Sequence, residues 1–568
     1  MHKIWRLRAA SPCPEHFASW AAKLSISTRI AGLLWNRGLT SLEEMDRFLC
    51  PGLRYLMAPG DIPGLTQAAE AVAAALTAGK RLVVWGDYDV DGVTATALML
   101  DFLSRRGFTA GHHIPVRFEE GYGVNIAGLE HLKNLGADMV LTVDCGISAV
   151  KEAERAKELG LALVVTDHHL PGPELPKAAA IANPKLAQGP ASDLAGVGVA
   201  FFLAAALNAL LPGDPIDIRQ FLDLAAIGTL ADVVSLTGQN RILVKNGLLL
   251  LAQASRPGVF ALKEASGYAP KAPLEATQVT FGLAPRVNAA GRLKRADEAL
   301  SLFLAPDLDT ARPLARALDQ LNTRRREEEE SISVQALEQA KEQPPGQSAL
   351  VLYGPEWHPG VIGIVASRVV DAYYRPALVF TLENGKLKGS GRSIPEVDLY
   401  AALDACRDTL LGFGGHRQAA GASLDPDNLA TLRDAFCRAV AAQLGPAEPQ
   451  PNLTLDGELS FAEIHQGLIK ELDLMGPFGC GNPEPVFSSV PLAVKARRVF
   501  GNGGNHVLLE VRDQDAGVTL RAKAWRMAEA IGPEVTKQPL TLAFTPRLDT
   551  YNGLASVELR VRDFAVAS

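Results

Sequence analysis

Cysteine, long hydrophobic runs and internal repeats are scarce or missing in this sequence of 568 residues. Its six cysteines lie far apart and form no Cys-x-x-Cys pair, so we expect neither a disulfide framework nor a structural zinc site. No stretch contains about eighteen consecutive uncharged apolar residues, so the sequence predicts no membrane-spanning helix. The opening segment contains no continuous apolar core of the secretion-signal type. We therefore expect a cytoplasmic protein.

The chain also lacks an excess of positive charge. Its 56 Lys and Arg residues are outnumbered by 63 Asp and Glu residues, which leaves a formal net charge of -7. This balance excludes a protein that coats nucleic acid indiscriminately. It does not exclude local binding of nucleic acid, because binding depends on where the cations lie. Hydrophobic residues make up 48% of the sequence, and at this length we expect roughly three or four domains.

Hydrophobic patterning predicts an α/β protein whose first large domain contains a doubly wound parallel sheet. Short runs rich in Val, Ile and Leu, such as RLVVWGD and ADMVLTVDCG, alternate there with helical patterns. The predicted parts are a helical lead-in at 1–50, this α/β domain at 51–307, a long connecting helix at 308–345, a smaller α/β domain at 346–445, and a linker with a β domain at 446–568.

The C-terminal part is predicted to be almost entirely β. Three strands, a short helical piece at 528–532 and two further strands follow one another, which is the order of an OB-fold. The five predicted strands are 486–500, 506–513, 518–527, 540–548 and 556–566.

Three aspartates at alternate positions follow a predicted strand in VVWGDYDVDGVTATALM, and Gly92 opens the next predicted helix. Asp87, Asp89 and Asp91 would repel one another unless a cation neutralised them. Taken alone, the cluster also fits a helix N-terminus beside a solvated loop. A divalent-metal site is the interpretation that the rest of the sequence favours.

Further acidic and imidazole side chains follow other apolar runs, namely Asp144, Asp167, His168, His169 and Asp232. We expect these runs to be strands of the parallel sheet. The carboxyl ends of such strands open on one crevice where ligands bind, so the side chains that follow them should lie close together. A ligand set of carboxylates and imidazoles suits Mn²⁺ and can also bind Mg²⁺. Zinc is less favoured, because the set contains many carboxylates and no cysteine. The ligands suffice for two ions about 3.5–4 Å apart, an arrangement that suits hydrolysis of phosphoryl bonds.

The motifs DYDVDG, VDCG, TDHH and GTLADVV, in that order, resemble those of the DHH phosphoesterase superfamily. Within it, longer segments over nearly the whole chain resemble the RecJ exonucleases specifically. These segments are RFEEGYG, PRVNAAGRL, WHPGVIGIVASRV, GSGRS, GFGGHRQAAGA and GPFGCGNPEPVF. The resemblance implies a DHH domain, a DHHA1 substrate-binding domain at 346–445 and an OB-fold-like nucleic-acid-binding domain.

The resemblance also implies an activity and partners. It implies a 5′→3′ exonuclease that acts on single-stranded DNA, releases 5′-mononucleotides and serves recombination and repair. Single-strand-binding protein and a RecQ-type helicase are the implied protein partners. A small-substrate phosphodiesterase or pyrophosphatase with the same metal centre is one alternative, and a non-catalytic single-strand binder is another.

Residue by residue, the resemblance assigns five metal ligands, with Asp144 bridging two ions. It places His169 at the active site, Asp87 completes the first motif, and Asp167 is expected to orient the histidines. Asp223 is an alternative to Asp232 in the last motif. The catalytic set is Asp87, Asp89, Asp91, Asp144, His168, His169 and Asp232, of which Asp89, Asp91, Asp144, His168 and Asp232 are the metal ligands.

Candidate nucleic-acid contacts lie in three further regions. The glycine-rich GSGRS and GFGGHRQAAGA are expected to be loops whose backbone N–H groups approach phosphates, helped by nearby Arg and His. PRVNAAGRL either contacts the scissile region or is a loop between domains, and His358 contacts substrate or only begins a helix. Trp525 stacks on bases or lies in the core. The candidates are Arg117, Arg286, Asn288, Arg292, His358, Ser390, Arg392, His416, Arg498, Arg521 and Trp525.

Overall fold

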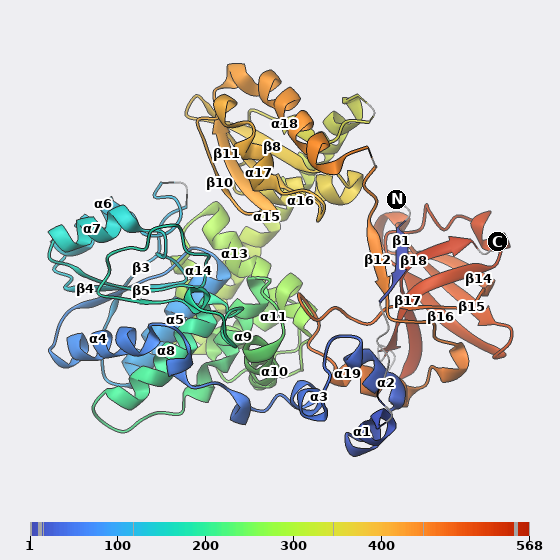
Figure 1. The fold of residues 1–568 in the computed structure, drawn as a ribbon, viewed down its shortest axis with the longest axis horizontal. Coiled ribbons are helices and arrows are strands. Elements are labelled where there is room, and N and C mark those ends of the chain that lie inside the picture. The colour runs from blue at the N-terminus through green and yellow to red at the C-terminus, as the bar shows by residue number, and fades with distance from the viewer. Residues whose placement is uncertain are drawn as a thin grey trace. The chain divides into compact units, whose positions relative to one another are not determined.

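The computed structural model describes residues 3–8, 14, 16–117, 119–344, 346–446, 448–549 and 555–566. Contacts divide them into two compact units (Figure 1). One contains the described residues of 285–299 and 312–451, and the other those of 2–284, 300–311 and 452–568. No helix in these described ranges is both long and apolar enough to cross a membrane.

The second of these units contains the predicted doubly wound domain. Its five-stranded sheet has the order β3-β2-β4-β5-β6, and every neighbouring pair is parallel. Helices α6 and α7 cover one face, and α4, α5 and α8 cover the other (Figure 1). The strands are β2 (Leu82–Trp85), β3 (Gly111–His113), β4 (Met139–Val143), β5 (Ala162–Thr166) and β6 (Ala180–Ala182); the helices are α4 (Leu65–Thr77), α5 (Val90–Arg105), α6 (Ile126–Asn134), α7 (Val150–Glu158) and α8 (Gly196–Leu210).

A helical layer follows the sheet and corrects one prediction. The apolar run before Asp232 is not a strand but α9 (Leu222–Ala231), which packs against α5, α8 and α10. All residues from Leu222 to Leu230 are buried, so the run lacks the polar face that would identify a helix. The other helices are α10 (Gly238–Gln253), α11 (Pro257–Ala265), α12 (Ala276–Gln278), the π-helical turn η5 (Val279–Leu283) and α14 (Asp297–Phe303).

The unit around residues 312–451 is a smaller α/β fold whose five-stranded sheet has the order β10-β11-β9-β8-β7. Only β7 and β8 are parallel among its strand pairs. The predicted long helix exists as α15 (Leu308–Glu342). The remaining elements are α13 (Ala284–Leu293), α16 (Ile362–Tyr373), α17 (Leu399–Asp404), α18 (Leu429–Leu444), β7 (Leu350–Tyr353), β8 (Ala377–Glu383), β9 (Lys386–Arg392), β10 (Gly412–Gly415) and β11 (Ala419–Leu424).

The glycine-rich segments in this unit are not the predicted loops. GSGRS forms the end of β9, and GFGGHRQAAGA forms the hairpin of β10 and β11. Glycine is needed in β9 because of packing: a Cβ on Gly389 would lie 2.3 Å from the Phe380 ring, and one on Gly391 would lie 2.6 Å from Leu378. PRVNAAGRL is likewise helical, since it lies within α13.

The C-terminal β domain has the sheet order β13-β17-β18-β16-β15-β14. The predicted strand at 486–500 is interrupted around Pro491, and 528–532 forms turns rather than a helix. Its elements are β12 (Asn452–Leu455), α19 (Gln466–Leu474), β13 (Phe487–Ser488), β14 (Ala493–Phe500), β15 (His506–Asp513), β16 (Val518–Ala524), β17 (Leu540–Asp549) and β18 (Ser556–Val566).

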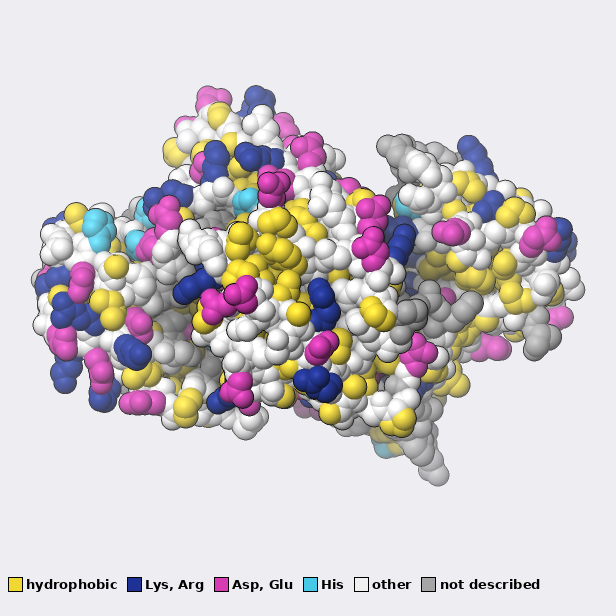
Figure 2. All heavy atoms as spheres, turned by 90° about the horizontal axis from the view of Figure 1, so that it is seen from above, with side chains coloured by type: hydrophobic (Ala, Val, Ile, Leu, Met, Phe, Trp, Pro, Cys, Tyr) yellow, Lys and Arg dark blue, Asp and Glu magenta, His cyan; other side chains and the backbone are white. Residues whose placement is uncertain are grey.

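The N-terminal segment joins this β domain instead of standing apart as a lead-in. Its strand β1 (Ile4–Leu7) pairs in parallel with β12, and its helices contribute to the same hydrophobic core as α19 and the β strands. Those helices are α1 (Phe17–Lys23), α2 (Thr28–Trp35) and α3 (Leu42–Leu49). On the face drawn in Figure 2, basic and acidic side chains are interspersed rather than sorted by sign.

Candidate metal centre and substrate contacts

The first acidic motif forms a tight connection between β2 and α5. Asp89 caps α5, and its carboxylate accepts hydrogen bonds from the N–H groups of Asp91 (2.9 Å) and Gly92 (3.1 Å). A Cβ on Gly92 would lie 2.5 Å from the backbone nitrogen of Asp87, so only glycine allows this close turn. Asp87 and Asp91 are buried as a result.

Asp144 follows β4, and the TDHH motif follows β5. Asp144 has a positive φ of 64°, a left-handed conformation that aspartate adopts more readily than most residues. The carboxylate of Asp167 accepts hydrogen bonds from the N–H groups of Ile147 (2.9 Å), His168 (2.7 Å) and His169 (3.0 Å). It also lies 2.7 Å from Nδ1 of His169, so Asp167 holds the histidine turn in place.

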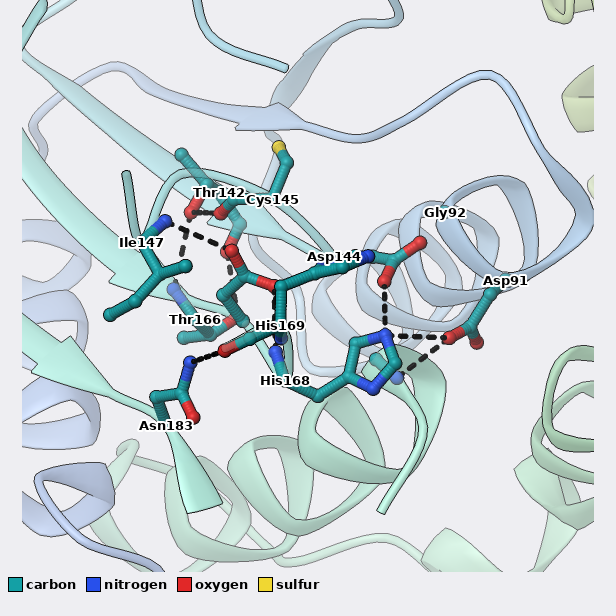
Figure 3. A network of polar contacts seen from close by, with 12 residues as sticks. Asp91, Gly92, Thr142, Asp144, Cys145, Ile147, Thr166, His168, His169 and Asn183 are labelled. Atoms are coloured by element: carbon teal, nitrogen blue, oxygen red, sulfur yellow. Dashed lines mark hydrogen bonds and ion pairs between the residues drawn. The ribbon is translucent and has the colours of Figure 1, made fainter. Parts of the chain in front are cut away.

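The side chains of Asp91 and Asp144 point toward the His168 ring (Figure 3), and Asp232 approaches the same ring. Its Nε2 atom lies 3.1 Å from Oδ1 of Asp144, 3.5 Å from Oδ2 of Asp232 and 3.9 Å from Oδ2 of Asp91. Two triads have ligand atoms within 4.8 Å of one another: Asp144 with His168 and His169, and Asp91 with His168 and Asp232.

The donor set fits divalent cations because its inward-facing atoms are otherwise unsatisfied. Oδ1 of Asp144, Oδ2 of Asp232 and Nε2 of His168 are buried and, apart from their close approach to one another, have no hydrogen-bond partner among the described residues. Oδ1 of Asp87 is in the same state. Buried polar atoms without partners are costly, and several of them converging on one point indicate an ion that would supply the missing bonds.

The electrostatics of the metal-free cluster lead to the same conclusion. Burial, together with the charge of Asp89, raises the pKa of Asp91 to about 7. Burial, with the charges of Asp91 and Asp89, raises the pKa of Asp232 to about 9. Burial and the neighbouring carboxylates also raise the pKa of Asp144 well above its usual range. Burial lowers the pKa of His168 to about 3, so this imidazole is neutral and able to ligate a metal at physiological pH.

Two glycines that sequence analysis did not identify permit this close approach. A Cβ on Gly196, at the start of α8, would lie 2.4 Å from Oδ1 of Asp144. A Cβ on Gly228, inside α9, would lie 2.8 Å from Oδ1 of Asp91. Gly196 also donates its N–H to Asp91 at 2.6 Å. In the sequence, the feature that could have identified them is a glycine within an apolar helical run. A glycine at such a position usually has a packing or functional reason.

Asp223, the alternative to Asp232, is committed elsewhere. Its Oδ2 accepts a hydrogen bond from Nε of Arg256 at 2.9 Å, and Nη1 of Arg256 also donates to Asp101 at 2.7 Å. This ion-paired triad joins α9, α11 and α5. Asp232 is the acidic residue of the motif that lies beside His168.

Arg117 lies next to the acidic cluster, with its guanidinium carbon 5.2 Å from the centre of the Tyr88 ring. Tyr122, in the same RFEEGYG segment, was not among the predicted site residues. Its hydroxyl lies 3.2 Å from Nδ1 of His169 and 3.5 Å from the carbonyl oxygen of Asp144. An aromatic residue next to the glycines of RFEEGYG was the available signal.

The smaller unit brings Ser390 and Arg392 together. Nη1 of Arg392 donates to Oγ of Ser390 (3.2 Å) and to the carbonyl of Gly391 (2.8 Å). A Cβ on Gly363, in the first turn of α16, would lie 2.9 Å from Oγ of Ser390, so both side chains adjoin a helix N-terminus. His416 follows β10, and its N–H donates to the carbonyl of Ala419 at 2.8 Å.

The other candidates of this unit form internal contacts. Nε of Arg286 donates to Asp319 at 2.9 Å, and Nη1 of Arg292 donates to the carbonyl of Gly360 at 3.1 Å. Nδ1 of His358 accepts the N–H of Gly360 at 3.0 Å, two residues before α16 begins. Asn288 lies in α13 between the two arginines.

Trp525 is not a core residue, because 48% of its surface is exposed. Its ring contacts those of His506 and Phe500, with centroids 4.8 and 5.4 Å away. Arg498 is exposed on β14, whereas Nη2 of Arg521 on β16 donates to Oγ of Ser556 at 2.9 Å. Exposed aromatic and basic side chains on an OB-type sheet are suited to base stacking and phosphate contact.

Comparisons with known proteins match all three large regions. Residues 81–229 match the DHH family, N-terminal domain; residues 346–442 match the DHHA1 domain; and residues 455–563 match the RecJ OB domain. The single-stranded-DNA-specific exonuclease RecJ of Bacillus subtilis (strain 168) is 36% identical over 560 residues, which cover 98% of this chain and 70% of that protein. The Escherichia coli (strain K12) protein of that name is 36% identical, over 92% of this chain and 93% of that protein.

Solved structures agree with the sequence matches. The fold is similar to that of RecJ from Thermus thermophilus in complex with Mn²⁺, with a TM-score of 0.85 and 34% identity over 100% of this chain and 80% of that chain. For RecJ from the same organism in complex with Mg²⁺, the TM-score is 0.78 and the identity 32%, over 100% of this chain and 79% of that chain.

Proposed function

Since this chain belongs to the family of single-stranded-DNA-specific RecJ exonucleases, we propose that it hydrolyses single-stranded DNA from the 5′ end and releases 5′-mononucleotides. The observation that carries the proposal is the convergence of Asp91, Asp144, Asp232 and His168, the last three of which have buried, unsatisfied atoms. The biological setting that we propose is recombination and repair.

Within this proposal, the ligands of two Mn²⁺ or Mg²⁺ ions are Asp89, Asp91, Asp144, His168 and Asp232. When bound, such ions polarise the scissile phosphate and stabilise the leaving oxygen. Asp144 would hold metal together with His168, whose Nε2 lies 3.1 Å from its Oδ1. Asp167 fixes the orientation of His169, and Tyr122 faces that imidazole from the opposite loop.

We propose that the remaining candidates hold the strand rather than cut it. Ser390 and Arg392, beside the N-terminus of α16, are suited to a terminal phosphate, and Arg117 would add charge near the metals. Arg286, Asn288, Arg292, His358 and His416 are proposed to contact the strand near the scissile bond. Arg498, Arg521 and Trp525 would contact it further along. Binding should weaken with salt, because phosphate contacts dominate.

A cytoplasmic location and two protein partners complete the proposal. The partners are a single-strand-binding protein and a RecQ-type helicase, each of which would supply single-stranded DNA. Pull-down of either partner with the purified chain, with and without DNA, is the direct test of this part.

The decisive experiment is a time course on one oligonucleotide labelled at the 5′ or the 3′ end, with Mn²⁺ and Mg²⁺ in parallel. We expect the 5′ label to appear as mononucleotide at the earliest times, while the 3′ label shortens progressively. Early release of the 3′ label as mononucleotide would show that the chain digests DNA from the 3′ end instead. Hydrolysis of pyrophosphate or dinucleotides without any shortening of the strand would indicate a small-substrate enzyme, and binding without shortening would indicate a non-catalytic binder.

A further inference from the structure

The segment GPFGCGN, residues 476–482 and here named the docking loop, packs against the turn that follows Asp232. The N–H of Leu236 donates to the carbonyl of Cys480 at 2.8 Å. A Cβ on Gly481 would lie 2.1 Å from Oγ and 3.3 Å from Cα of Ser235, so it would meet both the side chain and the backbone of that residue. A loop of the C-terminal part therefore meets the chain only three residues beyond a candidate metal ligand.

Asp232 depends on its backbone for its position. It is the C-cap residue of α9, and its Oδ2 atom is buried without a hydrogen-bond partner among the described residues. The carboxylate of Asp91 is different, because it accepts the N–H groups of Gly196 at 2.6 Å and Val197 at 2.9 Å. The direction of the Asp232 side chain is thus set largely by the end of α9 and by the turn at 233–237.

That turn is strained at its first residue. Val233 has a φ of 62°, a left-handed conformation that β-branched residues rarely adopt. Such a conformation persists only where the surroundings hold it. On the far side of the turn, the surroundings are the docking loop and Nδ2 of Asn240, which donates to the carbonyl of Ser235 at 3.0 Å.

The docking loop is itself firmly anchored. Nη2 of Arg241, a buried residue of α10, donates to the carbonyl of Gly476 at 2.8 Å. Nδ2 of Asn482 donates to the carbonyls of Met475 and Pro477, each at 2.9 Å. Nη1 of Arg37 donates to Oδ1 of Asn482 at 2.8 Å. These contacts give the loop a defined position against which the turn can be held.

We propose that the docking loop is a positioning element for the metal centre: Gly481 and the carbonyl of Cys480 hold the strained turn at 233–237 and thereby place Asp232 for metal binding. This inference rests on the proposed function, in which Asp232 ligates a divalent ion. It gives the GPFGCGNPEPVF segment a role in the reaction although none of its residues lies among the candidate ligands.

The test compares Gly481→Ala with Gly517→Ala in the full chain. Both glycines have a φ of 69°, so both substitutions impose the same backbone strain. Only the Cβ at 481 meets the turn, because a Cβ at 517 has nothing within 4 Å. We expect Mn²⁺ affinity, measured by calorimetric titration, to fall about 10- to 100-fold in G481A, as is usual when support for a metal ligand is lost. In G517A it should stay near the wild-type value.

A second variant separates positioning from general damage. Ser235→Gly removes the two atoms that lie nearest to a Cβ at 481, Oγ and Cβ of Ser235, so S235G/G481A should recover most of the lost Mn²⁺ affinity and of kcat. The G481A loss of activity should also shrink as Mn²⁺ is raised, with KM for DNA little changed. Thermal unfolding in EDTA should show similar midpoints for G481A and G517A.

The outcomes distinguish the two proposals. If the wild-type chain neither bound Mn²⁺ nor shortened DNA, the proposed function would fail. If the wild type did both and G481A matched G517A in Mn²⁺ affinity, the positioning role would be wrong. Equal weakening in G481A and S235G/G481A would also overturn it, because contact with Ser235 would then not be the cause.

Discussion

The acidic cluster of the parallel-sheet domain and the glycine-rich strands of the smaller unit both carry predicted site residues, but they satisfy their polar groups differently. At the cluster, atoms of Asp144, Asp232 and His168 are buried without hydrogen-bond partners among the described residues. On β9, Arg392 is hydrogen-bonded to Ser390 and to its own strand. The polar atoms of the acidic cluster therefore need an ion to satisfy them, whereas Arg392 on β9 already has hydrogen-bond partners within the protein.

The contrast shows which patterns are diagnostic. Clustered carboxylates that are buried are costly unless a cation neutralises them, so a buried cluster of this kind restricts the function. Glycines have a second use, because neighbouring side chains such as Phe380 can require them for packing. The effects of substitutions on activity should therefore differ between the two regions, both in size and in the kinetic constant that changes.

The largest expected effect is the loss of the proposed bridging ligand. Asp144→Ala should lower kcat on single-stranded DNA by at least about 10³-fold, because the ions that would polarise the scissile phosphate would lose a carboxylate ligand. Initial rates under saturating Mn²⁺ and Mg²⁺ measure this. The control is Asp214→Ala, at an exposed aspartate of the same unit, which should be silent. Full activity of D144A with both metals would contradict the assignment.

Removal of metal should make stability depend on pH in a predictable direction. The raised pKa values of Asp91 (about 7) and Asp232 (about 9) mean that the folded, metal-free chain holds protons that the unfolded chain releases near pH 4. The stability that these two groups contribute in EDTA is therefore greatest below about pH 4 and falls as pH rises, until about pH 7 for Asp91 and about pH 9 for Asp232. His168 contributes little above about pH 7, because it is then mostly neutral in both states.

Saturating Mn²⁺ should cancel that trend, since binding displaces those protons and affinity should rise about tenfold per pH unit for each proton released. Unfolding midpoints with EDTA and with saturating Mn²⁺ at pH 6.5, 7.5 and 8.5 measure both effects. The gap between the two curves should widen with pH. A constant gap would mean that the carboxyls are already ionised without metal.

A substitution in the smaller unit is expected to have a moderate effect on KM, and the size of the effect should depend on whether the substrate carries a 5′-phosphate. Arg392→Ala should raise KM about 10- to 100-fold for 5′-phosphorylated DNA, because charge-assisted hydrogen bonds to phosphate are lost. The loss should be much smaller for 5′-hydroxyl DNA. Arg407→Ala, at an exposed arginine of this unit, is the control. Equal losses on both substrates would assign Arg392 to the structure of β9 instead.

The smallest effect is expected on the C-terminal sheet. Trp525→Ala should raise KM for long single strands about tenfold through lost stacking, and Trp525→Phe should retain most of the binding. Because we propose that Trp525 contacts the strand away from the scissile bond, a trinucleotide should be cut by W525A at the wild-type rate. Impaired cleavage of the trinucleotide would place Trp525 near the reaction or in a folding role.

Local strand-to-helix transitions were predictable because they follow from short-range chemistry. VVWGDYDVDG contains a buried strand, a capping aspartate and a glycine in immediate succession, and the structure has β2, Asp89 as N-cap and Gly92 in that order. The strands before Asp144 and Asp167 were predicted for the same reason. The run before Asp232 was misassigned, because a helix buried on all sides has no polar face and resembles a buried strand.

Long-range pairings were not predictable. Nothing near Ile4–Leu7 indicates that this strand pairs with Asn452–Leu455, on the other side of both α/β domains in sequence. The glycines of β9 reveal their purpose only beside Phe380 and Leu378. The docking loop likewise gains a role only through its contact with Ser235 and Leu236.

By itself, the amino-acid sequence determined the chemistry: which carboxylates and imidazoles exist, that they follow apolar segments, and that divalent ions are their natural partners. Only the tertiary structure decided which of them meet, since Asp232 rather than Asp223 lies beside His168 and Gly196 and Gly228 make room for the carboxylates. The reason is physical. Ligand preference belongs to individual side chains, whereas convergence and strain arise from packing between segments that are distant in the chain.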